Sequence, residues 1–171
     1  MMVLIEPDIP REEVTDQYVA TFIKGKFDSL SEVEKADAEV NLENCINITT
    51  VPAFDNLNEL NLTGCKNLVD ISALRNISYI LMDYCPKITN LSTLNNIDHL
   101  VISGCNQFTN TDISSIHGIR GIDLCGCTGI TDITNITVKD VMFEADQFSK
   151  DQVSKLEEAG IQVYIRYYCG Y

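Results

Sequence analysis

Residues 59–77 read ELNLTGCKNLVDISALRNI, and this stretch decides the fold because its apolar pattern recurs along the chain. Within it, Leu62 is followed three residues later by Cys65. The same pair of an apolar marker and a cysteine occurs five times, as Leu42/Cys45, Leu62/Cys65, Met82/Cys85, Ile102/Cys105 and Leu124/Cys127. The steps between these cysteines are 20, 20, 20 and 22 residues. A fixed period in this range predicts a solenoid.

Each repeat combines two spacings of apolar residues, a period of two followed by a period of three. A second apolar residue stands two positions before each marker, and such alternation predicts a short strand with one buried face. After the cysteine, apolar residues recur every third position, as in Leu68, Ile71, Leu74 and Ile77. A period of three favours a 3₁₀-like or extended threefold path over a full α-helix. Because one repeat cannot bury its apolar face alone, neighbouring repeats must stack.

When the five repeats are aligned, their apolar and cysteine positions form columns, and this pattern resembles that of the leucine-rich repeat family. The family's core pattern, L-x-x-L-x-L-x-x-N/C-x-L, matches residues 57–68, with two residues rather than one after the cysteine. The resemblance covers about residues 39–148 in five concordant copies. It implies an α/β solenoid with a parallel sheet on its concave face. It also implies protein binding as the usual role of such a scaffold, although a fold does not fix a function.

The segment before the repeats is predicted to cap one open end of the solenoid, as terminal repeats must. This N-terminal cap comprises residues 1–38, with a helix at about residues 11–24 that Gly25 ends. We expect residues 26–38 to form the return path of an incomplete repeat. The alternative is a second helix that a Ser31 capping box begins.

The repeats and the second cap complete the chain. Residues 39–148 are predicted to hold five full repeats and a sixth strand at residues 140–144. Residues 149–171 are predicted to form a C-terminal cap, made of a helix at 150–159, a strand at 161–167 and an aromatic tail. This cap would cover the sheet edge that the last repeat otherwise exposes.

Composition indicates a single acidic globular domain. The 171 residues are 45% hydrophobic and carry a net charge of −13. This balance argues against nucleic acid or an anionic membrane as the partner; it permits either a basic protein partner or a simply solvated acidic face. The chain has no long apolar run and no secretory signal, so we expect an intracellular protein if Met1 is the native start.

Five of the seven cysteines occupy the repeat column and are expected to point inward as reduced, buried thiols. Each S–H group could reach a loop carbonyl, whereas parallel side chains have poor geometry for a disulfide. The pair Cys125 and Cys127, near Cys105, is the one hint of a zinc site. However, Cys125 should point to the opposite strand face and no second ligand pair is present, so we expect no metal.

The sequence gives no sign of catalysis. It contains two histidines, His99 and His117. It contains no G-x-S-x-G elbow, P-loop, H-E-x-x-H helix or C-x-x-C pair. We therefore expect no enzymatic activity and no cofactor.

Binding is the better use of this scaffold, because strand residues between the buried ones should form the concave surface. Stacking places Leu81 beside Val101, with Tyr79 and His99 in the next row. We expect these four residues to form the centre of a protein contact, with acids at its rim. The predicted partner-binding residues are Tyr79, Leu81, Asp83, His99, Val101, Asp123 and Met142. The alternative is a face that is merely solvated or is covered by the chain's own termini.

The sequence thus predicts a non-enzymatic protein–protein interaction module whose partner it does not identify. An alternative is a structural subunit of a large assembly, such as a virus particle, which would occur in a fixed ratio. A third hypothesis is a ubiquitin-ligase adaptor, because some leucine-rich repeat proteins carry an F-box. Residues 1–38 show no convincing F-box pattern, which weakens that hypothesis.

Overall fold

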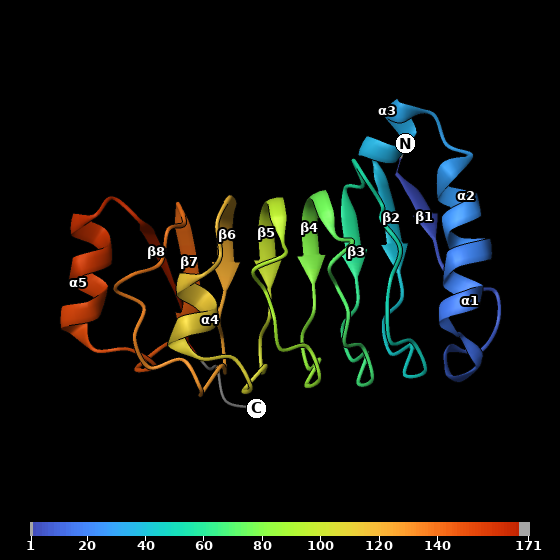
Figure 1. The fold of residues 1–171 in the computed structure, drawn as a ribbon. Helices are drawn as coiled ribbons and strands as arrows, with labels where there is room; N and C mark the ends of the chain where they lie inside the picture. The colour runs from blue at the N-terminus through green and yellow to red at the C-terminus, as the bar shows by residue number, and fades with distance from the viewer. Residues whose placement is uncertain (1, 168–171) are drawn as a thin grey trace.

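The chain folds around one parallel β-sheet of eight strands that lie in chain order (Figure 1). The computed structural model describes residues 2–167, without the side chain of Asn95. The strands are β1 (Val3–Ile5), β2 (Ala38–Asn41), β3 (Glu59–Asn61), β4 (Arg75–Leu81), β5 (Asn95–Val101), β6 (Ile119–Asp123), β7 (Asp140–Glu144) and β8 (Gln162–Arg166). This all-parallel sheet with few helices is compatible with the predicted solenoid.

Short helices stand at both ends of the sheet and beside β6 (Figure 1). A 3₁₀ turn at Arg11–Glu13 precedes a continuous helical segment made of α1 (Asp16–Tyr18), a π-helical stretch (Val19–Ile23) and α2 (Lys24–Asp28). The other helices are α3 (Glu32–Ala36), α4 (Asn110–Ser114) and α5 (Lys150–Glu158). Within residues 2–167, no helix combines the length and the apolar composition that crossing a membrane requires.

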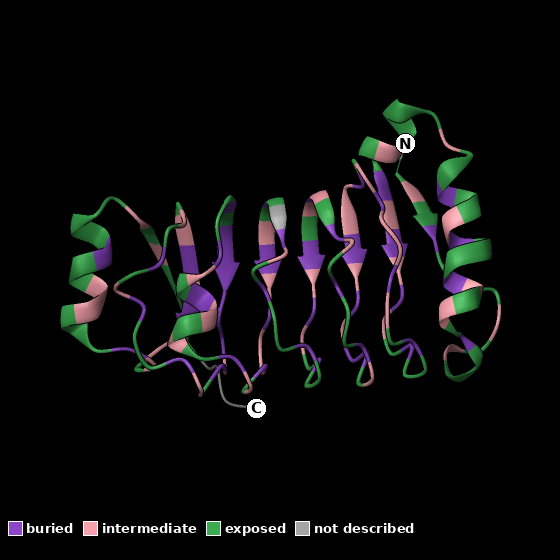
Figure 2. Cartoon of the chain, viewed as in Figure 1, coloured by how far each residue is buried: buried purple, intermediate pink, exposed green. Residues whose placement is uncertain are grey.

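The register of the sheet follows the period of the sequence repeat. Leu60 lies opposite Ile80, Ile80 opposite Leu100, and Leu100 opposite Ile122. All four side chains are buried, so each repeat adds the same column to one continuous core (Figure 2). The two extra residues of the fourth repeat fall near α4, in the path between β5 and β6, and the strand register is kept.

The cysteine column is buried and hydrogen-bonded, as predicted. The thiols of Cys65, Cys85, Cys105 and Cys127 donate to main-chain oxygens of the preceding repeat, at Leu42 (3.1 Å), Leu62 (3.1 Å), Met82 (3.2 Å) and Ile102 (3.0 Å). The six described cysteines are free. Burial raises the pKa of the Cys85 and Cys127 thiols to about 12, so both stay protonated donors at neutral pH.

After β7, where the column has no cysteine, a different side chain makes the hydrogen bond to the preceding repeat. Asp146 occupies the cysteine position there and is exposed. The amide Nε2 of Gln147 instead donates to the main-chain oxygen of Leu124 at 2.9 Å. The main-chain oxygens of Leu42, Leu62, Ile102 and Leu124 also accept the N–H of the residue three positions later at 3.1 Å, so the cysteine or glutamine side chain adds a second hydrogen bond to these carbonyls.

The residue before each column cysteine turns the backbone into the left-handed region. Tyr84 adopts φ 55° and Gly104 adopts φ 70°. A Cβ atom on Gly104 would lie 2.5 Å from the ring of Tyr84, so the tyrosine of one repeat covers the glycine of the next. Glycine is favoured at position 104 for both reasons, its φ angle and the space that it leaves.

The N-terminal helix begins and ends later than predicted. Its N-cap is Thr15, whose hydroxyl accepts a hydrogen bond from the main-chain N–H of Tyr18, whereas Pro10 offers no side-chain cap to the earlier turn. The helix then continues through Gly25 to Asp28. Gly25 does not end the helix, because the buried residues on either side of it, Ile23 and Phe27, hold the segment against the core.

Residues 26–38 do not form the return path of an incomplete repeat, so that prediction was wrong. They contain the end of α2 and then α3, which Ser31 and Glu34 begin with a reciprocal capping box. Apolar residues recur at every third position from Phe27 to Ala36, as in the repeats, but the local hydrogen bonds of the capping box outweighed this pattern. The sheet also starts one strand earlier than expected, because Val3–Ile5 pairs in parallel with β2.

Two contacts hold the N-terminal helical segment against the first repeat. The carboxylate of Asp16 accepts hydrogen bonds from the main-chain N–H (2.7 Å) and the hydroxyl (2.6 Å) of Thr49. The ring of Phe27 meets the ring of Phe54 edge-on, with centroids 5.3 Å apart. Both phenyl rings are buried, so this end of the core is closed by aromatic packing.

The predicted C-terminal helix and strand are confirmed as α5 and β8. Ser149 and Gln152 form the expected capping box, and Leu156 is the buried residue of the helix. β8 pairs with β7 over five residues and forms the last strand of the sheet. The aromatic tail of the prediction lies outside the described residues, apart from Tyr167, which is exposed.

Candidate functional site

The sheet has a second face, opposite the core, on which two rows of side chains lie in register. The first row is Glu39, Glu59, Tyr79, His99, Gly121, Asp140 and Gln162. The second row is Asn41, Asn61, Leu81, Val101, Asp123, Met142 and Tyr164. We call this surface the non-core face. Most of its residues are partly exposed, in contrast to the buried residues that alternate with them.

All seven predicted partner-binding residues lie on the non-core face or at its edge. Tyr79 lies beside His99 and Leu81 lies beside Val101, as predicted. Asp83 follows directly after β4, and its carboxylate accepts a hydrogen bond from the main-chain N–H of Ser103 at 2.7 Å. Tyr79 is 42% exposed, and the predicted residues apart from Asp123 are at least partly exposed.

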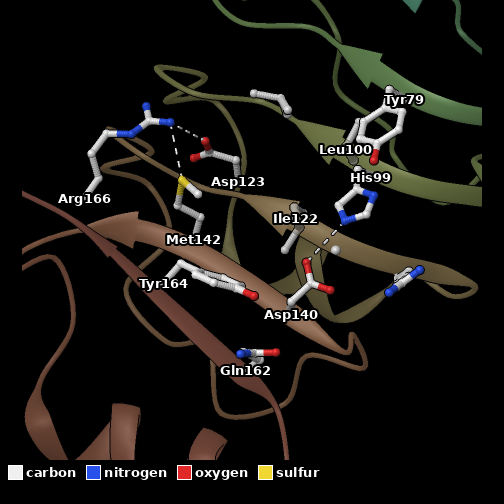
Figure 3. Close-up of a pocket in the computed structure, with 13 residues that line it drawn as sticks. Tyr79, His99, Leu100, Ile122, Asp123, Asp140, Met142, Gln162, Tyr164 and Arg166 are labelled. Carbon is white, nitrogen blue, oxygen red and sulfur yellow. Dashed lines mark hydrogen bonds and ion pairs between the residues drawn. The ribbon is translucent and has the colours of Figure 1, made fainter. Parts of the chain in front are cut away.

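A hollow of about 400 Å³ opens on the C-terminal half of this face (Figure 3). Five of the predicted residues line it, namely Tyr79, His99, Val101, Asp123 and Met142. Leu81 and Asp83 lie outside it. The opposite wall comes from β8, which contributes Gln162, Tyr164 and Arg166 (Figure 3).

A histidine–aspartate pair crosses one strand in the middle of the hollow. The Nε2 atom of His99 on β5 lies 3.5 Å from Oδ1 of Asp140 on β7. The intervening residue on β6 is Gly121, where a Cβ atom would clash with the Asp140 carboxylate and would lie 2.6 Å from Cδ2 of His99. The absence of a side chain at Gly121 therefore allows the pair to form.

The imidazole of His99 is held on both sides. Its ring stacks on the ring of Tyr79, with centroids 4.9 Å apart and planes 6° apart. Its Nδ1 atom is buried and has no hydrogen-bond partner in the described part of the chain. With its ring stacked on Tyr79, the histidine directs Nε2 toward the Asp140 carboxylate.

Asp123 is not the exposed rim acid that the sequence predicted. It is only 8% exposed and accepts hydrogen bonds from the main-chain N–H of Cys125 (2.9 Å) and from Nη2 of Arg166 (3.0 Å). The same guanidinium lies 3.3 Å from the sulfur of Met142. Arg166 reaches back from β8 across β7, so the C-terminal strand covers and neutralises Asp123.

Cys125 lies on the strand face opposite the cysteine column, as predicted, but it is buried rather than open to solvent. Burial raises the pKa of its thiol to about 12, and the hydrogen bond and negative charge of Asp123 act in the same direction. At neutral pH the side chain is a thiol and not a reactive thiolate.

Three carboxylates on this face or at its edge form no ion pair within residues 2–167, although the positive charge of Arg166 acts on the third of them. They are Glu39, Glu59 and Asp83. Burial raises the pKa of Glu59 above its usual range, and the charge of Glu39 on the neighbouring strand adds to this shift. Burial likewise raises the pKa of Asp83, with a further contribution from Asp123. Negative charge is therefore concentrated on this face at a cost in stability.

We expect Asp83→Asn to stabilise the protein at neutral pH. A carboxyl group whose pKa is raised by folding destabilises the folded state once it ionises, and an amide can still accept the hydrogen bond from Ser103. The melting temperature should rise by about 2 °C near pH 7. Below the ordinary Asp pKa of about 4, both states protonate Asp83 in the wild type, and the difference should disappear.

Thermal melts of both proteins across this pH range measure the effect. The control is Asp146→Asn, which removes the same charge from an exposed position with a left-handed backbone that asparagine also tolerates. A variant that is less stable than the wild type at neutral pH, or a difference that grows as the pH falls, would contradict the prediction.

Sequence reasoning missed the residues that complete the hollow. Asp140 was not among the predicted partner-binding residues, and the contribution of β8 was not recognised. Alternation within β8 was a usable signal, because Tyr164 and Arg166 must face opposite to Val163. The sequence contains no such signal for the space that Gly121 leaves, because this space matters only where the side chains of His99 and Asp140 meet across β6.

Comparison with known proteins adds no assignment to this geometry. No known family model matches the sequence, and a search of curated proteins finds no match.

Proposed function

We propose that this chain is a leucine-rich repeat solenoid that acts as a non-enzymatic protein-interaction module and binds a protein partner through its non-core face. The observation that carries the proposal is the pair of registered rows that leads into the hollow. Tyr79, Leu81 and Val101 present apolar and aromatic surface there, with acids on both sides. Such a mixed patch on a preformed surface is typical of a protein-binding site.

The assignment to the repeat family is supported by the agreement between sequence columns and sheet register. The residues two positions before each marker stack directly on one another across β2 to β6. The column cysteines bond the carbonyl oxygens of the preceding repeat. The non-core face would then be the concave side of the solenoid.

The charge of the face indicates the chemistry of the partner. Glu39, Glu59 and Asp83 form no ion pair among residues 2–167, and the whole chain carries a net charge of −13. A basic protein segment with apolar side chains would complement both the acids and the Leu81/Val101 patch. An acidic segment would add repulsion to carboxylates whose pKa values burial already raises.

The experiment compares capture of partners by the wild type and by Leu81→Glu/Val101→Glu. A matched control is Ile46→Glu/Val69→Glu, which adds the same charge at two exposed apolar positions after the column cysteines. Thermal melts establish that each variant folds, because Leu81 and Val101 are partly rather than fully exposed. A captured protein is then purified and its affinity is measured with all three chains.

We expect one basic partner that binds the wild type and the control variant but is lost from the face variant. Partners that bind all three chains equally would place the binding site elsewhere and overturn the proposal. Recovery of the chain in a particle of fixed stoichiometry, unaffected by the face variant, would favour the structural-subunit hypothesis instead.

A further inference from the structure

We propose that the hollow around Asp140 is an anchor pocket for a single basic side chain, an arginine or a lysine, of the protein partner. This inference rests on the proposed function for the origin of the ligand. It goes further by naming the group that the hollow receives and the residue that binds it. Asp140 would provide the charge, and Tyr164 would provide an aromatic wall.

Asp140 is prepared for such a role by its surroundings. Its Oδ1 lies 3.5 Å from Nε2 of His99, which is longer than an ordinary hydrogen bond, so the carboxylate can still accept hydrogen bonds from a ligand. Its side chain is 22% exposed, which leaves the group accessible from the hollow. Figure 3 shows Asp140 between the imidazole of His99 and the ring of Tyr164, with its other oxygen directed away from the histidine.

The aromatic groups around Asp140 favour a planar or compact cation. Tyr164 is 45% exposed and lines the hollow, whereas Tyr79 also lines it but has its ring stacked on His99, away from Asp140. A guanidinium or ammonium group gains from a carboxylate and from an adjacent ring face at the same time. A hollow of about 400 Å³ also leaves room for the chain that carries this group.

Two arginines line the same hollow and must be weighed against this assignment. Arg166 is held by Asp123 at 3.0 Å, so its charge is already neutralised by a buried acid. Arg120 directly precedes Gly121 on β6, at the Asp140 end of the hollow, but it is exposed and forms no ion pair with Asp140 in the described part of the chain. A ligand that used Arg120 would be anionic, and it would have to approach a face that already carries Glu59 and Glu39.

The test uses defined probes on the full chain rather than an unidentified partner. The first probe is acetyl-glycyl-arginyl-glycine amide. The second replaces arginine by citrulline, which keeps the shape and removes the charge, and the third replaces it by glutamate. Titrations are followed through the backbone amide resonances of Gly121, Asp140 and Tyr164, in the wild type and in Asp140→Asn and Asp146→Asn.

We expect the arginine probe to shift these resonances saturably and to bind about tenfold more tightly than the citrulline probe, because a charge-assisted hydrogen bond is lost. Asp140→Asn should weaken the arginine probe by about tenfold, whereas Asp146→Asn, an equal change in charge at an exposed site outside the hollow, should change it less than about twofold. Thermal melts confirm that both variants remain folded.

Other results would overturn the anchor pocket. Equal binding of arginine and citrulline, absence of saturable shifts, or tighter binding of the glutamate probe would each do so, and the last would assign the hollow to Arg120. If the probes fail while Leu81→Glu/Val101→Glu still loses its partner, this inference alone is wrong. If the arginine probe binds as expected while that variant keeps its partner, the proposed function is wrong and the pocket stands.

Discussion

Removal of residues 149–171 is expected to make the protein aggregate. The deletion removes α5 and β8, and β8 pairs with β7 along five residues. Without it, the N–H and C=O groups of β7 become an open edge that can pair with another chain. The buried side chain of Leu156 is lost with α5, so the end of the core is exposed as well.

Packing at this end shows why the loss should be large. Phe143 on β7 is 2% exposed and meets the ring of Phe148 edge-on, with centroids 4.9 Å apart. Both rings remain in the truncated chain, but the elements that cover them do not. Exposed aromatic residues beside an unpaired strand are a strong driving force for aggregation.

Size-exclusion chromatography with light scattering measures the outcome, and dye binding reports the exposed apolar surface. A point variant, Leu156→Asp, tests the same contact without deletion and should cost about 4 kcal/mol or more, since it buries a charge. Its control is Ser154→Asp, on an exposed position of the same helix. A truncated chain that elutes without aggregates and melts at the wild-type temperature would show that these residues do not cap the sheet.

The repeated part of the fold could be predicted because each position is constrained many times. Leu60, Ile80 and Leu100 share one environment, so their sequence columns report the same buried row. The thiol hydrogen bonds followed for the same reason, since each cysteine meets the same carbonyl of the repeat before it.

The ends of the chain were predicted less well because they occur once. The spacing of apolar residues by three positions from Phe27 to Ala36 matches that of a repeat's return path, but the Ser31 capping box determined the local structure. Gly25 looked like a helix stop, but a glycine ends a helix only where the backbone turns left-handed, and here it does not.

The candidate site was predicted as a surface but not as a pocket. Alternation places Tyr79, Leu81, His99 and Val101 on one face, and register places them side by side. The burial of Asp123 depends on Arg166, which is 43 residues away in the sequence. No periodic pattern reports a contact between two elements that do not share a repeat.

Phe54→Ala is expected to lower the free energy of unfolding by about 3–5 kcal/mol. The phenyl ring of Phe54 is fully buried and packs edge-on against Phe27 of α2, where the other repeats carry an aliphatic residue such as Leu74. Removing the ring leaves a cavity and detaches the N-terminal helical segment from the first repeat. Because domains of this kind are stable by only about 5–15 kcal/mol, the loss is a large share of the total.

A double-mutant cycle with Phe27→Ala separates the ring contact from the cavity. We expect the sum of the two single losses in unfolding free energy to exceed the loss in the double variant by about 1 kcal/mol, which is the coupling that an edge-on aromatic pair usually gives. Urea unfolding followed by circular dichroism suits a chain without tryptophan. Phe22→Ala, on the exposed side of the same helical segment, is the control and should cost about 0.5 kcal/mol or less. If Phe54→Ala cost no more than this control, the helix would not be packed on the first repeat, and the sheet would have to be stable without its N-terminal cover.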